Sequence, residues 1–124
     1  MTPNSSEAER LLEREPGDPA EDALAIARRY GAVVSSSSLI ASPAGRLWRS
    51  GSGHVGLGTS GSGDVLAGAI TGLAARGATA DQAAVWATHL HGAAGDRLAA
   101  RVGPLGYLAS ELVAELPLAL VEVG

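Results

Sequence analysis

The chain contains no cysteine, so disulfide bonds and thiolate metal sites are excluded. It also contains no phenylalanine, and aromatic residues make up only 3% of it. Apolar residues make up 46% of the chain, so its core must be built mainly from Ala, Leu, Val and Ile. No apolar run approaches the roughly 18 residues that a membrane-spanning helix needs.

The charge of the chain limits its partners further. The net charge is −4 at pH 7, which argues against a general nucleic-acid binder because such proteins carry a basic surface. The first 18 residues are polar and acidic, which is unlike a signal peptide. We therefore expect a cytoplasmic protein with no nucleic-acid or membrane partner, and 124 residues suffice for one domain of ordinary size.

What the sequence does have is a glycine-rich stretch, residues 51–68, in which seven residues are glycine. After Gly63 the apolar residues recur at helical spacing, so the stretch predicts a flexible loop that leads directly into a helix. The free amides and the dipole of such a helix start favour an anion. Asp64 lies at the same point, where its carboxylate would repel a phosphate unless it has a further task.

Other interpretations of this stretch remain open. A glycine-rich loop is often only a turn, and Asp64 is then a helix cap. The length of the loop, the Thr59 and Ser60 hydroxyls and the abrupt helix start favour phosphate binding instead. The P-loop pattern is excluded because no Gly-Lys-Ser/Thr follows. A dinucleotide fingerprint is disfavoured because Arg49 and Ser50 do not end a long apolar strand.

The rest of the chain predicts mostly helices, with short strands only between residues 32 and 49. The expected helices cover residues 5–14, capped by Ser5 or Ser6, and residues 19–30, 64–76, 80–101 and 108–116. The expected strands cover residues 32–34, 39–41 and 46–49, with a turn at 43–45. The four serines 35–38 predict neither strand nor helix, and Pro117 is expected to interrupt the last helix.

This order predicts an α/β fold with few short strands and a block of helices. A parallel sheet needs strands that alternate with helices, and here the helices have too little sheet to cover. We therefore expect residues 1–124 to form part of a larger α/β unit, or a domain that a partner chain completes. Such a chain is not expected to be a self-sufficient monomer.

Three motifs carry a resemblance to a known family. They are Gly61-Ser62-Gly63-Asp64, Leu-His-Gly-x-x-Gly-Asp at 90–96, and Thr-Pro-Asn-x-x-Glu at 2–7. With them, residues 2–120 resemble the C-terminal part of the ADP- or ATP-dependent NAD(P)H-hydrate dehydratases, which have a ribokinase-like fold. The resemblance implies that the N-terminal half of that fold is absent here.

The resemblance also implies a function. The family consists of repair enzymes, lyases that remove water from hydrated NADH or NADPH at the expense of ADP or ATP, with Mg²⁺ expected beside the nucleotide. By this likeness, Asp64 is the catalytic base and contacts the hydrate hydroxyl, and Asn4 is a further substrate contact. The amides of Gly61, Ser62 and Gly63 would hold the phosphate. No metal site made of protein side chains is expected, and we expect a homo-oligomer.

The sequence departs from the family pattern at two places. A Val-Val-x-Lys-Gly-x-x-Thr segment usually holds the nucleotide phosphate, whereas here residues 35–38 are serines and the Lys-Gly pair is missing. Asn4 stands where many relatives have a histidine. The alternatives are therefore a small-molecule kinase of the same fold, with Asp64 as base, and a non-catalytic remnant or assembly partner.

The remaining candidate side chains give weaker signals. His54 lies just before the anion loop and is a candidate ligand contact. His89 and His91 are two residues apart and do not share a helical face, which argues against a metal pair. We interpret His91 as a polar packing residue near a helix crossing. The other candidates are interpreted as a solvated or capping acid, Asp96, and as core or subunit-contact residues, Trp48 and Trp86.

Overall fold

The computed structural model describes residues 1–53 and 55–123, and within them it has an α/β fold, as predicted. The described elements are, in chain order, α1 (Ser5–Leu12), α2 (Pro19–Tyr30), β1 (Val34–Ser36), β2 (Leu39–Ala41), β3 (Leu47–Arg49), the 3₁₀ helix η1 (Val55–Gly58), α3 (Ser62–Ala75), α4 (Ala80–Val102) and α5 (Ala109–Val123).

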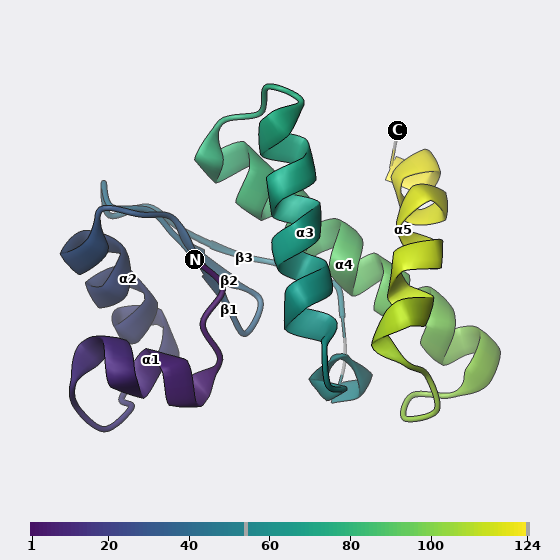
Figure 1. The fold of residues 1–124 in the computed structure, drawn as a ribbon, viewed down its shortest axis with the longest axis horizontal. Helices are drawn as coiled ribbons and strands as arrows, with labels where there is room; N and C mark the ends of the chain where they lie inside the picture. Colours follow the sequence, from purple (N-terminus) through teal and green to yellow (C-terminus); the bar gives the residue numbers. More distant parts are fainter. Residues whose placement is uncertain (54, 124) are drawn as a thin grey trace.

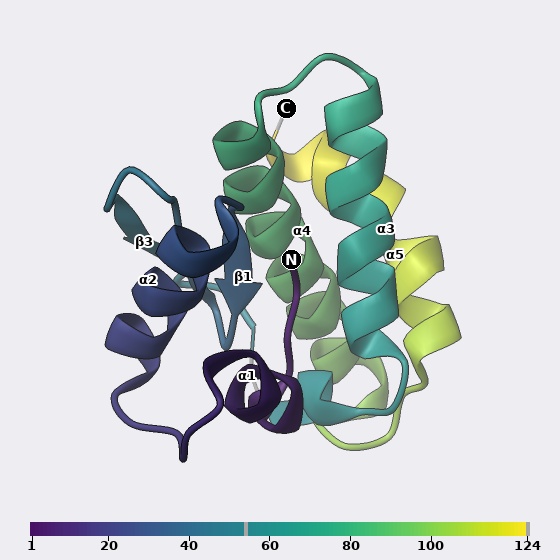
Figure 2. The ribbon, with the colours of Figure 1, turned by 60° about the vertical axis from the view of Figure 1, so that its left-hand side comes forward.

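The elements form two groups, which Figure 1 shows side by side: α1, α2 and the sheet in one, and α3, α4 and α5 in the other. Each group has its own apolar cluster. The first lies between α2 and the sheet, and the second lies where α4 meets α5. In Figure 2, α4 lies between the sheet and α3, so this helix joins the two groups. None of the described helices is both long and apolar enough to cross a membrane.

The sheet is an antiparallel meander in the order β1-β2-β3. Val34 pairs with Ala41, and Ile40 pairs with Trp48. The predicted hairpin of residues 39–49 is therefore confirmed. The strand expected at 32–34 instead covers Val34–Ser36, so the serine run is partly strand.

Tertiary bonds explain why two serines are in a strand despite their weak propensity. The Ser35 N–H donates to the Met1 carbonyl at 2.8 Å, and the Ser36 hydroxyl donates to the Pro3 carbonyl at 3.0 Å. Inside the protein, the Ser35 and Thr88 hydroxyls share a hydrogen bond of 2.8 Å. The N-terminal segment and α4 thus hold β1 in place from two sides.

Ser37 and Ser38 form the two-residue loop between β1 and β2. Both have positive φ, 50° for Ser37 and 66° for Ser38. Positive φ at both positions matches the twist of a hairpin, but Asn-Gly is the usual pair there. A side chain in this left-handed region costs about 1–2 kcal/mol per residue. The second half of the serine run is therefore a strained turn.

The helix ends agree with the sequence at most positions. Asp18 caps α2 and Gly31 ends it, while Thr79 caps α4 in a capping box with Gln82. The expected cap of α1 was wrong, because the cap is Asn4 and not Ser5 or Ser6. Asn4 accepts from the Glu7 N–H at 2.9 Å and its own N–H donates to the Glu7 carboxylate at 2.8 Å, so this box is also complete.

The last helix differs most from its prediction. α5 runs from Ala109 to Val123 and continues through Pro117, which was expected to interrupt it. A proline removes one backbone bond, but tertiary contacts compensate for it here. Glu115 of α5 is buried, with its side chain 3% exposed, and it forms ion pairs with Arg97 and Arg101 of α4. Arg97 also forms an ion pair with Glu122, beyond the proline, so α4 holds α5 on both sides of Pro117.

We predict that Glu115→Gln lowers the free energy of unfolding by about 1–3 kcal/mol, because Arg97 and Arg101 lose this buried charged partner and Arg97 keeps only the exposed Glu122. The Arg97 hydrogen bond outweighs burial and lowers the pKa of Glu115 below its ordinary value. The carboxylate therefore stabilises the fold above the unfolded pKa of about 4.3, and this contribution is lost as the pH falls through the lower folded pKa. Thermal melts from acid to neutral pH measure both effects.

The difference in stability between wild type and Glu115→Gln should shrink at the acid end of that series. Glu9→Gln is the control, since Glu9 is an exposed carboxylate on α1 and should change stability little. A difference that stays constant through the acid range would show that the charge of Glu115 is not the source of its effect.

A second prediction concerns the strained turn. Ser38→Gly should raise the free energy of unfolding by about 0.5–1 kcal/mol, because the left-handed cost exceeds the entropy cost of glycine. The change keeps the backbone bond in which the Ser38 carbonyl accepts from the Ser50 N–H at 2.8 Å. The control is Ser110→Gly in the first turn of α5, which should be neutral or destabilising. Equal melting shifts for both variants would contradict the strain argument.

Candidate functional site

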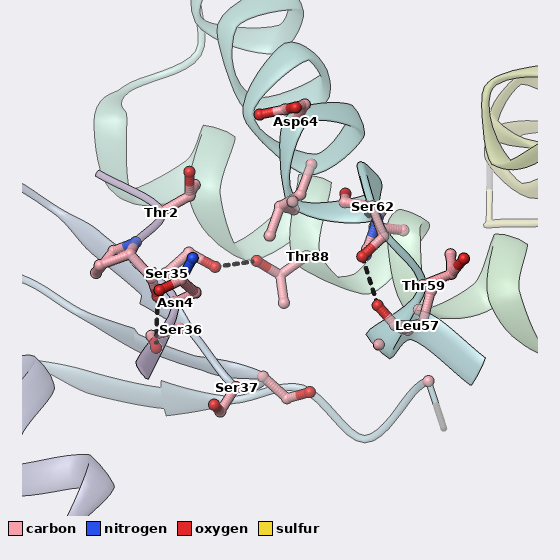
Figure 3. A pocket seen from close by; sticks show the side chains of 18 of the residues that line it. Thr2, Asn4, Ser35, Ser36, Ser37, Leu57, Thr59, Ser62, Asp64 and Thr88 are labelled. Carbon is pink, nitrogen blue, oxygen red and sulfur yellow. Dashed lines mark hydrogen bonds between the residues drawn. The ribbon is translucent and has the colours of Figure 1, made fainter. Parts of the chain in front are cut away.

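A hollow of about 920 Å³ lies between the two groups of elements. Four segments line it: the N-terminal segment from Thr2 to Glu7, the serine run 35–38, residues 52–53 and 57–64 of the glycine-rich stretch, and one face of α4. Figure 3 shows Asp64 on the first turn of α3, across this hollow from Asn4 and Ser36. The structure thus places all the predicted site residues, Asn4 and residues 61–64, in the wall of one hollow.

The hollow is polar, and the described residues that line it include no lysine or arginine. Hydroxyl groups line most of it, contributed by Thr2, Ser5, Ser35, Ser36, Ser37, Ser38, Ser52, Thr59, Ser60, Ser62 and Thr88. The acidic side chains in its wall are Glu7 and Asp64, whereas no arginine lines it and the chain contains no lysine. For an anion, these described residues offer backbone N–H groups, hydroxyls and the side-chain amide of Asn4.

Those N–H groups lie at the start of α3. Gly61 is the N-cap with φ of 88°, and its residue type leaves no side-chain cap. Asp64 is the third residue of the helix, so the alternative in which it is the cap is wrong. Within the described residues, the N–H groups of Gly63 and Asp64 have no protein acceptor. They are two free donors at the positive end of the helix dipole.

Ser62 has a different role from its neighbours in this structure. Its N–H donates to the Thr59 carbonyl at 3.2 Å, and its hydroxyl donates to the Leu57 carbonyl. A phosphate would have to displace the Thr59 carbonyl to reach the Ser62 amide. Phosphate contact by the amides of Gly61, Ser62 and Gly63 therefore stays a prediction. Of these, the Gly63 amide is free to bind a phosphate without displacing another group.

Two glycines of α4 allow the glycine-rich loop to pack closely against this helix. A Cβ on Gly92 would lie 2.4 Å from the Ser52 hydroxyl and 2.7 Å from the Ser52 carbonyl carbon. A Cβ on Gly95 would lie 2.7 Å from a methyl group of Leu57. A Cβ at position 92 would force the loop backbone to shift, whereas a Cβ at position 95 would force the Leu57 side chain to move. The Leu-His-Gly-x-x-Gly-Asp spacing thus has a structural reason.

Polar groups of α4 in and beside this motif bind the loop. The Ser52 hydroxyl donates to the His89 carbonyl at 2.9 Å, and the Gly53 N–H donates to the Asp96 carboxylate at 3.1 Å. The interpretation of Asp96 as an acid in a capping network therefore agrees with the structure, because it is exposed and accepts from a loop amide. His91 contacts the start of α3, where its Nε2 lies 2.9 Å from the Ser62 carbonyl.

His91 is a neutral donor in this arrangement. Its side chain is buried, and burial lowers its pKa below the ordinary value although the Ser62 carbonyl opposes the shift. A carbonyl oxygen only accepts, so Nε2 must carry the proton. The interpretation of His91 as a polar packing residue is confirmed. Among the described residues there is also no group of three acidic or histidine side chains that could hold a metal.

Three further predictions have different outcomes. His54 lies outside the described residues. Trp86 is 50% exposed and meets His89 edge to face, so its interpretation as a core residue was wrong and a subunit contact stays a prediction. Trp48 is half-buried on β3.

Sequence reasoning missed Thr88 and Ser52. Thr88 ties α4 to Ser35 of the sheet, and Ser52 ties the loop to α4. Thr88 precedes His91 by three residues, so both lie on one helical face. This spacing was the sequence signal that could have assigned Thr88 to the same polar face as His91. Neither hydroxyl stood out because serine and threonine are frequent in any loop or helix.

Comparison with known proteins places this geometry in a family. A family model described as NAD(P)H-hydrate dehydratase matches residues 1–118. The ADP-dependent (S)-NAD(P)H-hydrate dehydratase of Xanthomonas campestris pv. campestris is 49% identical over 102 residues, which cover 80% of this chain and 35% of the relative. The enzyme of the same name from Neisseria meningitidis serogroup B is 38% identical over 120 residues, which cover 90% of this chain and 40% of the relative.

A solved structure supports the same assignment. The ADP/ATP-dependent NAD(P)H-hydrate dehydratase from Bacillus subtilis, co-crystallized with ATP/Mg²⁺, matches 99% of this chain and 47% of its own chain with a TM-score of 0.87 and 27% identity. This chain therefore spans about half of the solved relative and 35–40% of the two curated ones. Since the family model extends over nearly its whole length, the chain belongs to the NAD(P)H-hydrate dehydratase family.

Proposed function

We propose that this chain carries the phosphate-handling part of an ADP- or ATP-dependent dehydration of hydrated NAD(P)H. The observation that carries the proposal is the pair of free amides at Gly63 and Asp64, directly beside the Asp64 carboxylate in the wall of the hollow. The family and the names of the relatives supply the reaction. The chain spans only part of those relatives, so a complete activity needs further sequence.

The geometry suggests a role for each side of the hollow. The amides at the start of α3 bind the transferring phosphoryl group as neutral donors. The Asp64 carboxylate accepts the proton of the hydrate hydroxyl while the hydroxyl oxygen attacks the terminal phosphorus of the nucleotide, whose bond to ADP (from ATP) or AMP (from ADP) breaks. Loss of the new phosphate group from the hydrate carbon, with a proton from the neighbouring atom, then completes the dehydration. Asn4 lies on the opposite wall, where its Oδ1 is occupied by the Glu7 N–H. Its amide NH₂ group remains the group with which it would contact the substrate.

The nucleotide and the metal fit this part of the chain differently. Free amides and hydroxyls suit a phosphate chain, so the hollow fits ADP or ATP. A metal ion fits less well, because the described residues contain no group of three side chains that could hold one. Mg²⁺ would have to arrive with the nucleotide, and we derive no step through it.

A non-catalytic binding role is the alternative, and the absence of a cationic side chain from the wall of the hollow favours it. Phosphoryl transfer is usually assisted by a lysine, an arginine or a metal near the transferring group. A chain with the amides alone would bind phosphate but would not turn it over. Measuring both binding and turnover separates this alternative from the dehydratase.

We predict that the chain binds ADP and ATP weakly, at a Kd above the micromolar range, because a charge-assisted contact is missing from the serine run. Such a contact is typically worth about 1.5–3 kcal/mol, or roughly ten- to a hundred-fold in affinity. Ser37→Lys should recover part of it, since Ser37 is exposed and lines the hollow. Isothermal titration calorimetry measures both chains. Ser37→Gln is the neutral control, and micromolar binding by the wild type would contradict the prediction.

The role of Asp64 gives the next prediction. In an enzyme that contains this segment, Asp64→Asn keeps the shape of the side chain but removes the base, so turnover should fall about 10²–10⁴-fold. Nucleotide affinity should stay equal or rise, because a negative charge beside the phosphates is gone. Steady-state kinetics measures the turnover, and calorimetry measures the nucleotide affinity.

The control for this variant is Asp81→Asn. Asp81 occupies the first turn of α4 as Asp64 occupies that of α3, but it does not line the hollow. The Asp81→Asn variant should therefore have the turnover and the nucleotide affinity of the wild type. Full turnover by Asp64→Asn would remove the base from the mechanism.

The proposed assembly is a homo-oligomer, and exposed apolar side chains support it. The most exposed of them are Leu105, Leu108, Val113 and Val121, in and before α5. Patches of this kind mark interaction surfaces. Sedimentation velocity should show a species larger than one chain, and a compact monomer that melts cooperatively would contradict this. The cytoplasmic location stays a prediction.

A further inference from the structure

The contact between His91 and Ser62 acts on the peptide unit that carries one of the two free amides. The Ser62 carbonyl and the Gly63 N–H belong to the same planar trans peptide, so they point in opposite directions. His91 Nε2 holds the carbonyl side at 2.9 Å. The N–H side then faces away from α4, at the end of α3 that lines the hollow.

We propose that His91 is a positioning residue, whose Nε2–H fixes the Ser62–Gly63 peptide so that the Gly63 N–H is aimed into the hollow as a phosphate donor. The phosphate part of this inference rests on the function proposed above. The hydrogen bond from the imidazole also polarises the peptide, which makes its N–H a stronger donor.

The start of α3 has few other anchors. Gly61 gives no side-chain cap, although a Cβ there would lie 3.3 Å from the Ala109 Cβ, and a Cβ on Gly63 would meet nothing within 4 Å. Ser62 is held instead, through its N–H to Thr59 and its hydroxyl to Leu57. Of these bonds, only the one from His91 acts on the peptide unit of the free Gly63 amide. Within α3 the Ser62 carbonyl also accepts the helical bond from the N–H four residues on, so His91 supplies a second, tertiary hold on the orientation of this donor.

The histidine acts without adding charge to the site. It is buried, and the protonated Nε2 already has its acceptor in the Ser62 carbonyl. A lysine or arginine at this place would attract an anion directly, whereas a neutral imidazole orients a donor. The distinction matters because a positioning role can be kept by another neutral donor of similar reach.

The test uses two variants of the 124-residue chain. The side-chain amide of His91→Gln offers an N–H donor near the place of Nε2, while His91→Leu has similar bulk and no donor. Inorganic phosphate is the probe, and the backbone ¹H–¹⁵N resonances of Gly63 and Asp64 are followed as it is added. His91→Leu should shift the free Gly63 resonance and weaken phosphate binding about three- to tenfold, as the loss of one positioned hydrogen bond predicts. His91→Gln should stay within twofold of wild type.

Leu98→Val separates this effect from general loosening of α4. Leu98 is fully buried in the second apolar cluster and does not line the hollow. The variant should lower the melting temperature and leave the phosphate response unchanged. If His91→Leu folds and keeps both the wild-type Gly63 resonance and the phosphate affinity, the inference is wrong.

The ring nitrogens give a readout that needs no ligand. Long-range ¹H–¹⁵N correlation should show the neutral His91 tautomer protonated at Nε2, and a proton at Nδ1 instead would overturn the proposal. A wild-type chain without any phosphate response would refute the proposed phosphate site. The tautomer and the Gly63 resonance would still decide whether His91 orients the peptide.

Discussion

The close approach of the glycine-rich loop to α4 is the constraint on which the candidate site depends. Gly92 and Gly95 leave the helix without side chains at the two points where Ser52 and Leu57 rest on it. At this separation even short groups can connect the two segments, as the bonds from Ser52 to the His89 carbonyl and from the Gly53 N–H to Asp96 show. A methyl group at position 92 would push the loop away and lengthen these bonds together.

Local chemistry made part of this structure predictable. Asp18, Gly31 and Thr79 end or begin helices for reasons that lie within four residues, so their roles could be stated from the sequence. The glycine-rich loop and Asp64 were likewise found as one unit, and the structure places them in the wall of one hollow.

The remaining features depend on contacts between distant segments. Ser35 belongs to a strand because Met1 and Thr88 bind it, and α5 passes Pro117 while Glu115 holds two arginines of α4. The Asn4 cap of α1 is the exception, because its capping box with Glu7 is local and the pattern stood in the sequence. No local pattern could show that His91 would reach the Ser62 carbonyl, 29 residues away in sequence.

The hollow has walls from both groups of elements, with the N-terminal segment and the serine run on one side and the start of α3 on the other. Each group has its own apolar cluster, and the bond between Ser35 and Thr88 is a direct polar link between them. A ligand that touches both walls binds only when both clusters are folded. Occupancy of the hollow would therefore couple two units that could otherwise open separately, and would make the chain unfold as one cooperative body.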